Sequence, residues 1–232
     1  AIPIGGRTLT LLESVHPTAK LGSAKVERQL LRDLKAMLPA NCQPIVITDA
    51  GFGTPWFRAV TDCGWDYIGR VRRGIGVETT PGTWTSSSVL LAQAMTKPTR
   101  LDNVRFTRSS RWPCHLVLAK RPRHGRKLLT QHGRPQRNKR ALVAQRRGRT
   151  PCLLATSLTL PPNKIVTLYG LRMQIEESFR DLKSERFGCA FHHSLTRKPD
   201  RIAILLLLQA LASFLAYLVA RQLDERSAQI TY

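Results

Sequence analysis

Two adjacent glutamates, Glu176 and Glu177, interrupt the most basic part of the chain. They lie in YGLRMQIEESFRDLK, residues 169–183, and residues 103–175 contain no acidic side chain at all. On a helix, at about 100° per residue, Glu176 shares one face with four other polar residues. These residues are Tyr169, Arg172, Arg180 and Lys183. A carboxylate among cations can hold a divalent metal ion while its neighbours bind the phosphates around that ion.

The same spacing has a simpler interpretation. Arg172–Glu176 and Glu176–Arg180 are i,i+4 pairs, and such pairs stabilise an exposed helix by only a few tenths of a kcal/mol, about 0.2–0.5 each. Helix geometry alone leaves both interpretations open.

A second carboxylate occupies a rigid position elsewhere in the chain. The stretch PIVITDAGF places Asp49 at the carboxyl end of an expected buried strand, Pro44–Thr48, just before Gly51. Functional groups of α/β proteins gather at this edge of the sheet. The alternative role for Asp49 is an Asx turn or the N-cap of the next helix.

The elements that must position these groups alternate along residues 1–72. AIPI and TLTLLESV read as strands around a glycine turn, and residues 21–38 carry an apolar stripe that predicts a helix. A short helix, PWFRAVTDCG, and a strand, WDYIGRVR, follow the Asp49 strand. This alternation predicts an α/β fold, a mixed sheet flanked by helices.

Residues 73–151 differ in character from the rest. They predict a basic, β-rich or partly disordered insertion, because residues 103–149 hold fifteen Lys or Arg and no acid. Residues 152–232 then supply the strand CLLATSL, the helix that carries Glu176 and an apolar C-terminal helix.

The apolar helix contains nineteen residues without a charge, Ile202–Ala220. That length could cross a bilayer, but Gln209 and Ser213 interrupt the stretch and the sequence has no second span. We therefore predict a helix packed on the sheet and no membrane partner.

Composition indicates a polyanionic partner. Lys+Arg 37 against Asp+Glu 15 gives a net charge of +22 and a pI near 11.1, which favours nucleic acid or an anionic membrane surface, and charge alone does not name which. The five cysteines show no metal-knuckle spacing, so we expect free thiols in a reducing cytoplasm and no structural zinc site. No signal peptide opens the chain, and its start at AIPIGG without methionine suggests a fragment.

These residues resemble a family of bacterial transposases. Tyr169, Arg172, Glu176 and Lys183 reproduce the tyrosine–arginine–glutamate–lysine signature of DDE transposases of the insertion sequence four family, similar to the transposon-ten transposase. The blocks ITDAGFGTPWF, CGWDYIGRVR and RMQIEESFRDLKSERFG also look like blocks of that group, and the resemblance covers most of the chain.

The resemblance implies an RNase H-like core, truncated here at its N-terminus and interrupted by the insertion. It implies that Asp49 and Glu176 are catalytic ligands of Mg²⁺ or Mn²⁺ in a two-metal site, and that Tyr169, Arg172, Arg180 and Lys183 bind DNA. The implied partner is double-stranded DNA, at transposon ends and target, bound by a homodimer in the bacterial cytoplasm at the nucleoid. The implied reaction is phosphodiester hydrolysis followed by strand transfer.

The sequence departs from the family pattern at two places. The family's first catalytic aspartate precedes the hairpin, but residues 1–32 contain no aspartate, and the first one, Asp33, lies inside the expected helix. Cys152 stands where several relatives have a tryptophan that stacks on a flipped base, and cysteine offers no stacking face.

Three interpretations remain at this point. The chain could be a transposase catalytic domain or a non-catalytic, DNA-binding remnant of one that lacks the first aspartate. It could also be a structural RNA-binding protein, for which a charge of +22 would be ordinary. The fixed spacing of the signature and the TDAGF block argue against the RNA-binding protein.

The basic segment gives a first prediction. DNA binding by the chain should be non-specific and should weaken steeply with salt, because clustered Arg and Lys release counterions from the phosphates. Deleting residues 120–149 should flatten the slope of log affinity against log salt, measured by fluorescence anisotropy. An unchanged slope would remove this segment from the DNA-binding surface.

Overall fold

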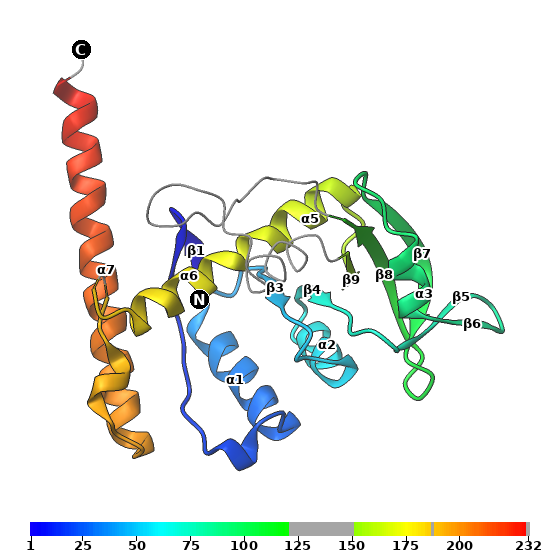
Figure 1. Ribbon diagram of the computed structural model, residues 1–232, viewed down its shortest axis with the longest axis horizontal. Coiled ribbons are helices and arrows are strands. Elements are labelled where there is room, and N and C mark those ends of the chain that lie inside the picture. Colours follow the sequence, from blue (N-terminus) through cyan, green and yellow to red (C-terminus); the bar gives the residue numbers. More distant parts are fainter. Residues whose placement is uncertain (121–150, 187, 231–232) are drawn as a thin grey trace, which may run out of the picture. The chain divides into compact units, whose positions relative to one another are not determined.

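Two compact units make up the protein. The computed structural model describes residues 1–120, 151–186 and 188–230 (Figure 1). One unit contains residues Pro39–Gly170, and the other combines Ala1–Leu38 with Leu171–Tyr232. We call them the sheet unit and the helical unit and describe each by itself.

A seven-stranded mixed sheet forms the sheet unit, in the order β3-β4-β9-β8-β7-β5-β6. The strands are β3 (Ile45–Thr48), β4 (Asp66–Arg70), β5 (Gly76–Thr80), β6 (Thr83–Ser86), β7 (Thr99–Phe106), β8 (Trp112–Ala119) and β9 (Cys152–Thr156). Only the β3–β4 pair is parallel, and the other pairs are antiparallel. The predicted α/β class and the strands around Asp49 are confirmed.

Helices cover the two faces of this sheet. On one face, α2 (Thr54–Asp62) places Phe57 against Tyr67 of β4, with ring centroids 4.5 Å apart and planes 7° apart. On the other face, α5 (Pro162–Leu171) buries Ile165 and Tyr169 in a core cluster. The strand residues of that cluster are Ile68, Val117 and Leu154. Strand β4 is therefore covered by a helix on each face.

The predicted insertion contributes to this same sheet. Strands β5 to β8 and the short helix α3 (Ser87–Ala92) lie within it, and β8 pairs with β9 in a register that opposes Leu118 to Leu153. The described part of the segment is therefore β-rich, as predicted. The predicted disorder falls on residues 121–150, outside the described residues, and the boundaries near residues 72 and 151 stay predictions.

The helical unit begins with a hairpin. Strands β1 (Ile2–Ile4) and β2 (Arg7–Leu9) pair antiparallel through Gly5 and Gly6, whose φ angles are 54° and 88°. A two-residue turn with both φ positive suits glycine and matches the twist of a hairpin. The unit also contains η1 (Thr18–Lys20), α1 (Ala24–Met37), α6 (Met173–Lys183), η2 (Phe191–Ser194) and α7 (Pro199–Ile230).

The helix expected over residues 169–183 is divided into α5 and α6. The two helices meet at Arg172, which keeps helical dihedral angles of φ −56° and ψ −28°. The Ile175 amide donates to the Arg172 carbonyl at 3.2 Å, an i→i−3 bond that starts α6 as a tighter turn. Tyr169 and Glu176 therefore lie on different helices, and in different units.

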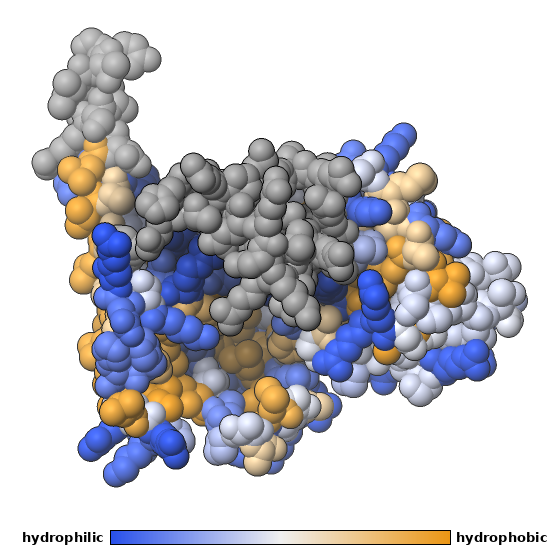
Figure 2. Space-filling model, in the orientation of Figure 1, coloured by the Kyte–Doolittle hydropathy of each residue, from blue (hydrophilic) through white to orange (hydrophobic). Residues whose placement is uncertain are grey.

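The apolar helix forms as predicted, but its described side chains, up to Leu223, are not fully buried. Within α7, Ile204, Leu207, Leu211 and Leu215 are 51–61% exposed, and Figure 2 shows exposed apolar side chains on this helix. Apolar residues occur all around this helix, so it has no single apolar face. The helix and the sheet belong to different units, so the expected packing of one on the other stays a prediction. Residues Pro199–Leu223 are long and apolar enough to cross a membrane by length and composition.

All five cysteines are free thiols, as predicted. Burial raises the pKa of the Cys114 thiol to about 12, so this side chain stays protonated at neutral pH.

A close helix–strand contact in the sheet unit gives a testable prediction. A Cβ added to Gly69 would lie 2.3 Å from Cε1 of Phe57, and Phe57 is fully buried. Gly69→Ala should therefore destabilise the unit by about 1–3 kcal/mol, the usual cost of overpacking.

Gly170→Ala is the matched control, because a Cβ there meets nothing within 4 Å and alanine favours a helix. Thermal unfolding should show a lower melting temperature for Gly69→Ala and an equal or higher one for Gly170→Ala. Equal melting temperatures for Gly69→Ala and the unmodified chain would contradict the packing argument.

Candidate functional site

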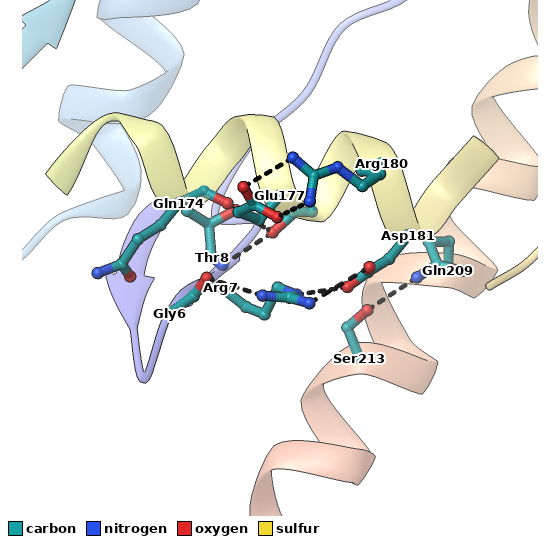
Figure 3. A network of polar contacts seen from close by, with 10 residues as sticks. Gly6, Arg7, Thr8, Gln174, Glu177, Arg180, Asp181, Gln209 and Ser213 are labelled. Carbon is teal, nitrogen blue, oxygen red and sulfur yellow. Dashed lines mark hydrogen bonds and ion pairs between the residues drawn. The ribbon is translucent and has the colours of Figure 1, made fainter. Parts of the chain in front are cut away.

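The hairpin anchors α6 through polar side chains on one face of that helix. The Thr8 amide donates to Oγ of Ser178 at 2.9 Å, and Nε of Arg7 donates to Asp181 at 2.5 Å. Figure 3 shows both hairpin residues directed at α6. The ion pair with Asp181 raises the pKa of the Arg7 guanidinium. Ser178 and Asp181 thus fix which side of α6 faces the hairpin.

Glu176 lies on the opposite side of α6. At about 100° per residue, Glu176 is roughly 160° from Ser178 around the helix, and its side chain is 47% exposed. Arg172, whose side chain is 18% exposed, donates to the Glu176 carboxylate. The hairpin therefore keeps the Glu176 face turned away from the contacts that hold the helix.

The other charged residues of this face are also exposed. Arg180 pairs with Glu177 at 2.6 Å, where the spacing suggested Glu176 as its partner. Lys183, at the last position of α6, is exposed. Of the two ion pairs in the simpler interpretation, Arg172–Glu176 is present, and Arg180 pairs with Glu177 in place of Glu176. These charged side chains form a solvent-facing row on α6.

Tyr169 occupies a different environment from the rest of the signature. Its side chain is only 9% exposed and packs in the core of the sheet unit with Ile165, Ile68 and Leu154. The sequence pattern placed it on the polar face, but the ring helps hold α5 on the sheet. The Tyr169 hydroxyl oxygen is buried as well, so its predicted contact with DNA would require it to become accessible.

Asp49 lies in the turn between β3 and α2, at the carboxyl end of β3 as predicted. Its side chain is exposed, and Oδ1 accepts a hydrogen bond from the Gly51 amide at 2.7 Å. This is the Asx turn of the alternative interpretation. A carboxylate can accept at both oxygens, so the turn orients Asp49 through Oδ1 and leaves Oδ2 for a cation.

Two neighbours shape the surroundings of Asp49. A Cβ at Gly51 would lie 2.8 Å from Oδ1 of Asp49, so glycine keeps this space open. Arg72 donates to the backbone carbonyls of Ala50 and Gly51, the latter at 3.2 Å. Arg72, just beyond the end of β4, therefore holds the turn that follows Asp49 through its backbone.

The structure divides the predicted site residues between the units. Arg172, Glu176, Arg180 and Lys183 belong to the helical unit, and Asp49 and Tyr169 belong to the sheet unit. Sequence reasoning missed Arg72, although its position just after a strand that neighbours β3 could have indicated it. It also missed a cluster of Glu185, His192 and His193, whose ligand atoms lie within 4.8 Å of one another.

Comparison with protein families decides the identity of the chain. The model of the family described as the transposase DDE domain matches residues 1–215. The chain belongs to this family. The α/β architecture with a mixed seven-stranded sheet is consistent with the RNase H-like core of a transposase DDE domain. A search of curated proteins found no match.

Family membership supports a general function. Transposase DDE domains act on DNA in transposition and generally use divalent metal ions. The carboxylates of Asp49 and Glu176 supply oxygen ligands, the type that hard divalent cations prefer. Both side chains are exposed, and Gly51 keeps one side of Asp49 open. The donor chemistry of these two residues therefore fits the metal ions that the family uses.

The burial of Tyr169 gives a prediction that separates folding from DNA binding. Tyr169→Ala should destabilise the sheet unit by about 3–5 kcal/mol, because it removes an aromatic ring from the core. Tyr169→Phe keeps the ring and should unfold at nearly the same temperature, so any loss of DNA-end affinity reports on the hydroxyl. Equal stability of the alanine variant and the unmodified chain, measured by denaturant unfolding, would contradict the core role.

Proposed function

We propose that the chain is the catalytic domain of a cut-and-paste transposase of the insertion sequence four type, similar to the transposon-ten transposase. The observation that carries the proposal is the orientation of α6. Polar contacts to Ser178 and Asp181 hold one side of the helix, and the opposite side presents Glu176 between cations. This side of α6 carries the arginine, glutamate and lysine of the signature.

In this proposal Asp49 and Glu176 are the ligands of Mg²⁺ or Mn²⁺. The Asx turn and Arg72 hold Asp49 in one orientation, so little side-chain freedom would be lost when it binds an ion. When bound, divalent ions would supply activation of the attacking oxygen and neutralisation of the charge that develops on the phosphate. The reaction is phosphodiester hydrolysis and then strand transfer, at the ends of a DNA element and at its target.

The cations of the α6 face would bind and orient the DNA backbone. Arg172 now donates to Glu176, and a metal ion on Glu176 would neutralise that carboxylate and leave the guanidinium for a phosphate oxygen. Arg180 and Lys183 extend the same basic face, and the Tyr169 hydroxyl completes the signature. The protein would act as a homodimer on double-stranded DNA at the bacterial nucleoid.

A second candidate function follows from the acidic residues. Residues 1–32 contain no aspartate, and Asp33 lies inside α1, where the Gln29 amide donates to it at 2.7 Å. Asp33 is therefore on a helix and not on the strand that would carry the family's first acid. If no upstream segment supplies that acid, the chain is a non-catalytic DNA-binding remnant.

Cleavage assays distinguish the two functions. Residues 1–232 alone should not cut a labelled transposon-end duplex with Mn²⁺, because two ions need a shared carboxylate between them. A chain extended upstream to include an aspartate-bearing strand should cut it, and Asp49→Asn or Glu176→Gln should each abolish that activity. Asp33→Asn is the matched control and should leave the cleavage rate unchanged.

Two results would contradict this proposal. Cleavage by residues 1–232 that Glu176→Ala abolishes would mean that another acid, with Glu177 the nearest, completes the site. Full activity of the Asp49→Asn variant in the extended chain would remove Asp49 from it.

A further inference from the structure

A cluster of metal-binding side chains lies just beyond the C-terminal end of α6. Glu185 follows α6, and His192 and His193 are consecutive residues of η2. The Nε2 atoms of the two histidines lie 3.0 Å and 3.2 Å from the same oxygen, Oε1 of Glu185. All three side chains belong to the helical unit, so their arrangement is independent of the sheet unit.

The spacing of these atoms matches the ligands of a small transition-metal ion. Zinc bonds to imidazole nitrogen and carboxylate oxygen are about 2.0–2.2 Å long, so two ligand atoms of a tetrahedral site lie about 3.3 Å apart. The two nitrogen–oxygen distances are close to this value, and the three ligand atoms all lie within 4.8 Å of one another. An ion can therefore be accommodated with small side-chain movements.

We propose that Glu185, His192 and His193 form a surface site for a zinc-class divalent transition metal ion. Two imidazoles and one carboxylate favour such an ion over Mg²⁺ or Ca²⁺, which prefer oxygen ligands alone. Three protein ligands leave a fourth position, which water would fill. The site is separate from the carboxylates of the proposed DNA chemistry and uses none of their residues.

The alternative is a simple surface ion pair, and two observations argue against it. The imidazole rings of His192 and His193 are 4.3 Å apart and converge on one carboxylate. A simple ion pair would need only one of the two rings on this carboxylate. A metal ion instead accounts for both rings, because each imidazole supplies one ligand nitrogen beside the carboxylate oxygen.

The backbone around η2 gives the second observation. Ala190 and Leu195, which flank the turn, have φ angles of 45° and 49°, a left-handed conformation that is unfavourable for residues with a Cβ. Such conformations persist where the surrounding structure holds them. Exposed ion pairs contribute little to stability, whereas a metal ion bound by Glu185, His192 and His193 would hold η2 beside the end of α6.

A bound ion would connect the end of α6 to the start of α7. Glu185 is two residues beyond Lys183, and His193 also lines a cavity of about 390 Å³ whose other walls include Leu182 of α6 and Leu208 of α7. We therefore expect the ion to hold the last turn of α6 in place and to raise the stability of the helical unit.

The test is zinc binding to the full chain after removal of metal ions with a chelator. Calorimetric titration with Zn²⁺ should detect a site, and Zn²⁺ should raise the melting temperature, because it binds only the folded form of that site. Glu185→Gln and the double variant His192→Ala/His193→Ala should bind at least about tenfold more weakly, since even outer-shell partners of metal sites contribute about 10–100-fold. Acidification should also weaken binding, because protons compete for the imidazole nitrogens.

Three control variants should keep the site. His16→Ala removes a histidine outside the cluster, and Cys189→Ser removes the exposed thiol nearest to η2 in the sequence. Asp49→Asn/Glu176→Gln removes the proposed catalytic carboxylates, so failure of that function leaves this test intact.

Three outcomes of the Zn²⁺ titration would overturn the site. One is an unchanged Zn²⁺ affinity in the double histidine variant. The others are loss of Zn²⁺ binding in Cys189→Ser and loss of Zn²⁺ binding in Asp49→Asn/Glu176→Gln. Circular dichroism should show that the cluster variants fold, because all three replaced side chains are exposed. For the unmodified chain, paramagnetic Co²⁺ should shift or broaden the ring signals of two histidines. The absence of any affected histidine signal would also reject the site.

Discussion

The contact between Phe57 and Gly69 is the constraint on which the position of Asp49 depends. Gly69 leaves the ring of Phe57 in direct contact with the backbone of β4, and the ring also stacks on Tyr67. The Tyr67 hydroxyl in turn accepts a hydrogen bond from Trp112 of β8 at 2.9 Å. This chain of contacts fixes α2 on the sheet, and the turn that carries Asp49 is the short link from β3 into α2.

Glu176 is held in a different way. Its helix has no side chain buried to the extent of Phe57, and polar bonds from the hairpin to Ser178 and Asp181 orient it. Exposed hydrogen bonds and ion pairs contribute less to stability than buried aromatic contacts. The carboxylate on the sheet is therefore supported by a rigid core, and the carboxylate on α6 by contacts that local unfolding can open more easily.

The sequence predicted best what depends on local pattern. Glycines 5 and 6 indicated the hairpin, the apolar stripe of residues 21–38 indicated α1, and the position of Asp49 after a buried strand was confirmed. The interruption at Arg172 was not predicted, because residues 169–183 were placed on one continuous helix. The burial of Tyr169 was not predicted either, because a core contact depends on residues distant in sequence. Apolarity likewise does not specify which surface α7 packs against, so that part of the prediction rests on the length and composition of the helix alone.

The cluster of Glu185 with two histidines was also beyond the sequence-based reasoning. Cysteine spacing indicated no structural zinc site. The two histidines reach Glu185 only through the 3₁₀ turn η2, which cysteine spacing does not reflect. Left-handed residues at positions 190 and 195 create this turn. A non-glycine residue gives little sign of such a conformation in the sequence.

The proposed function requires Asp49 and Glu176, which belong to different compact units, to bind the same divalent ion. The most direct measurement is a double-mutant cycle on Mn²⁺ affinity, followed by calorimetry or paramagnetic resonance, with Asp49→Asn, Glu176→Gln and the combined variant. Residues that share one ion are strongly coupled, so each single variant should lose nearly as much affinity as the combined variant. Losses that add independently would show two unrelated carboxylates and would contradict the account.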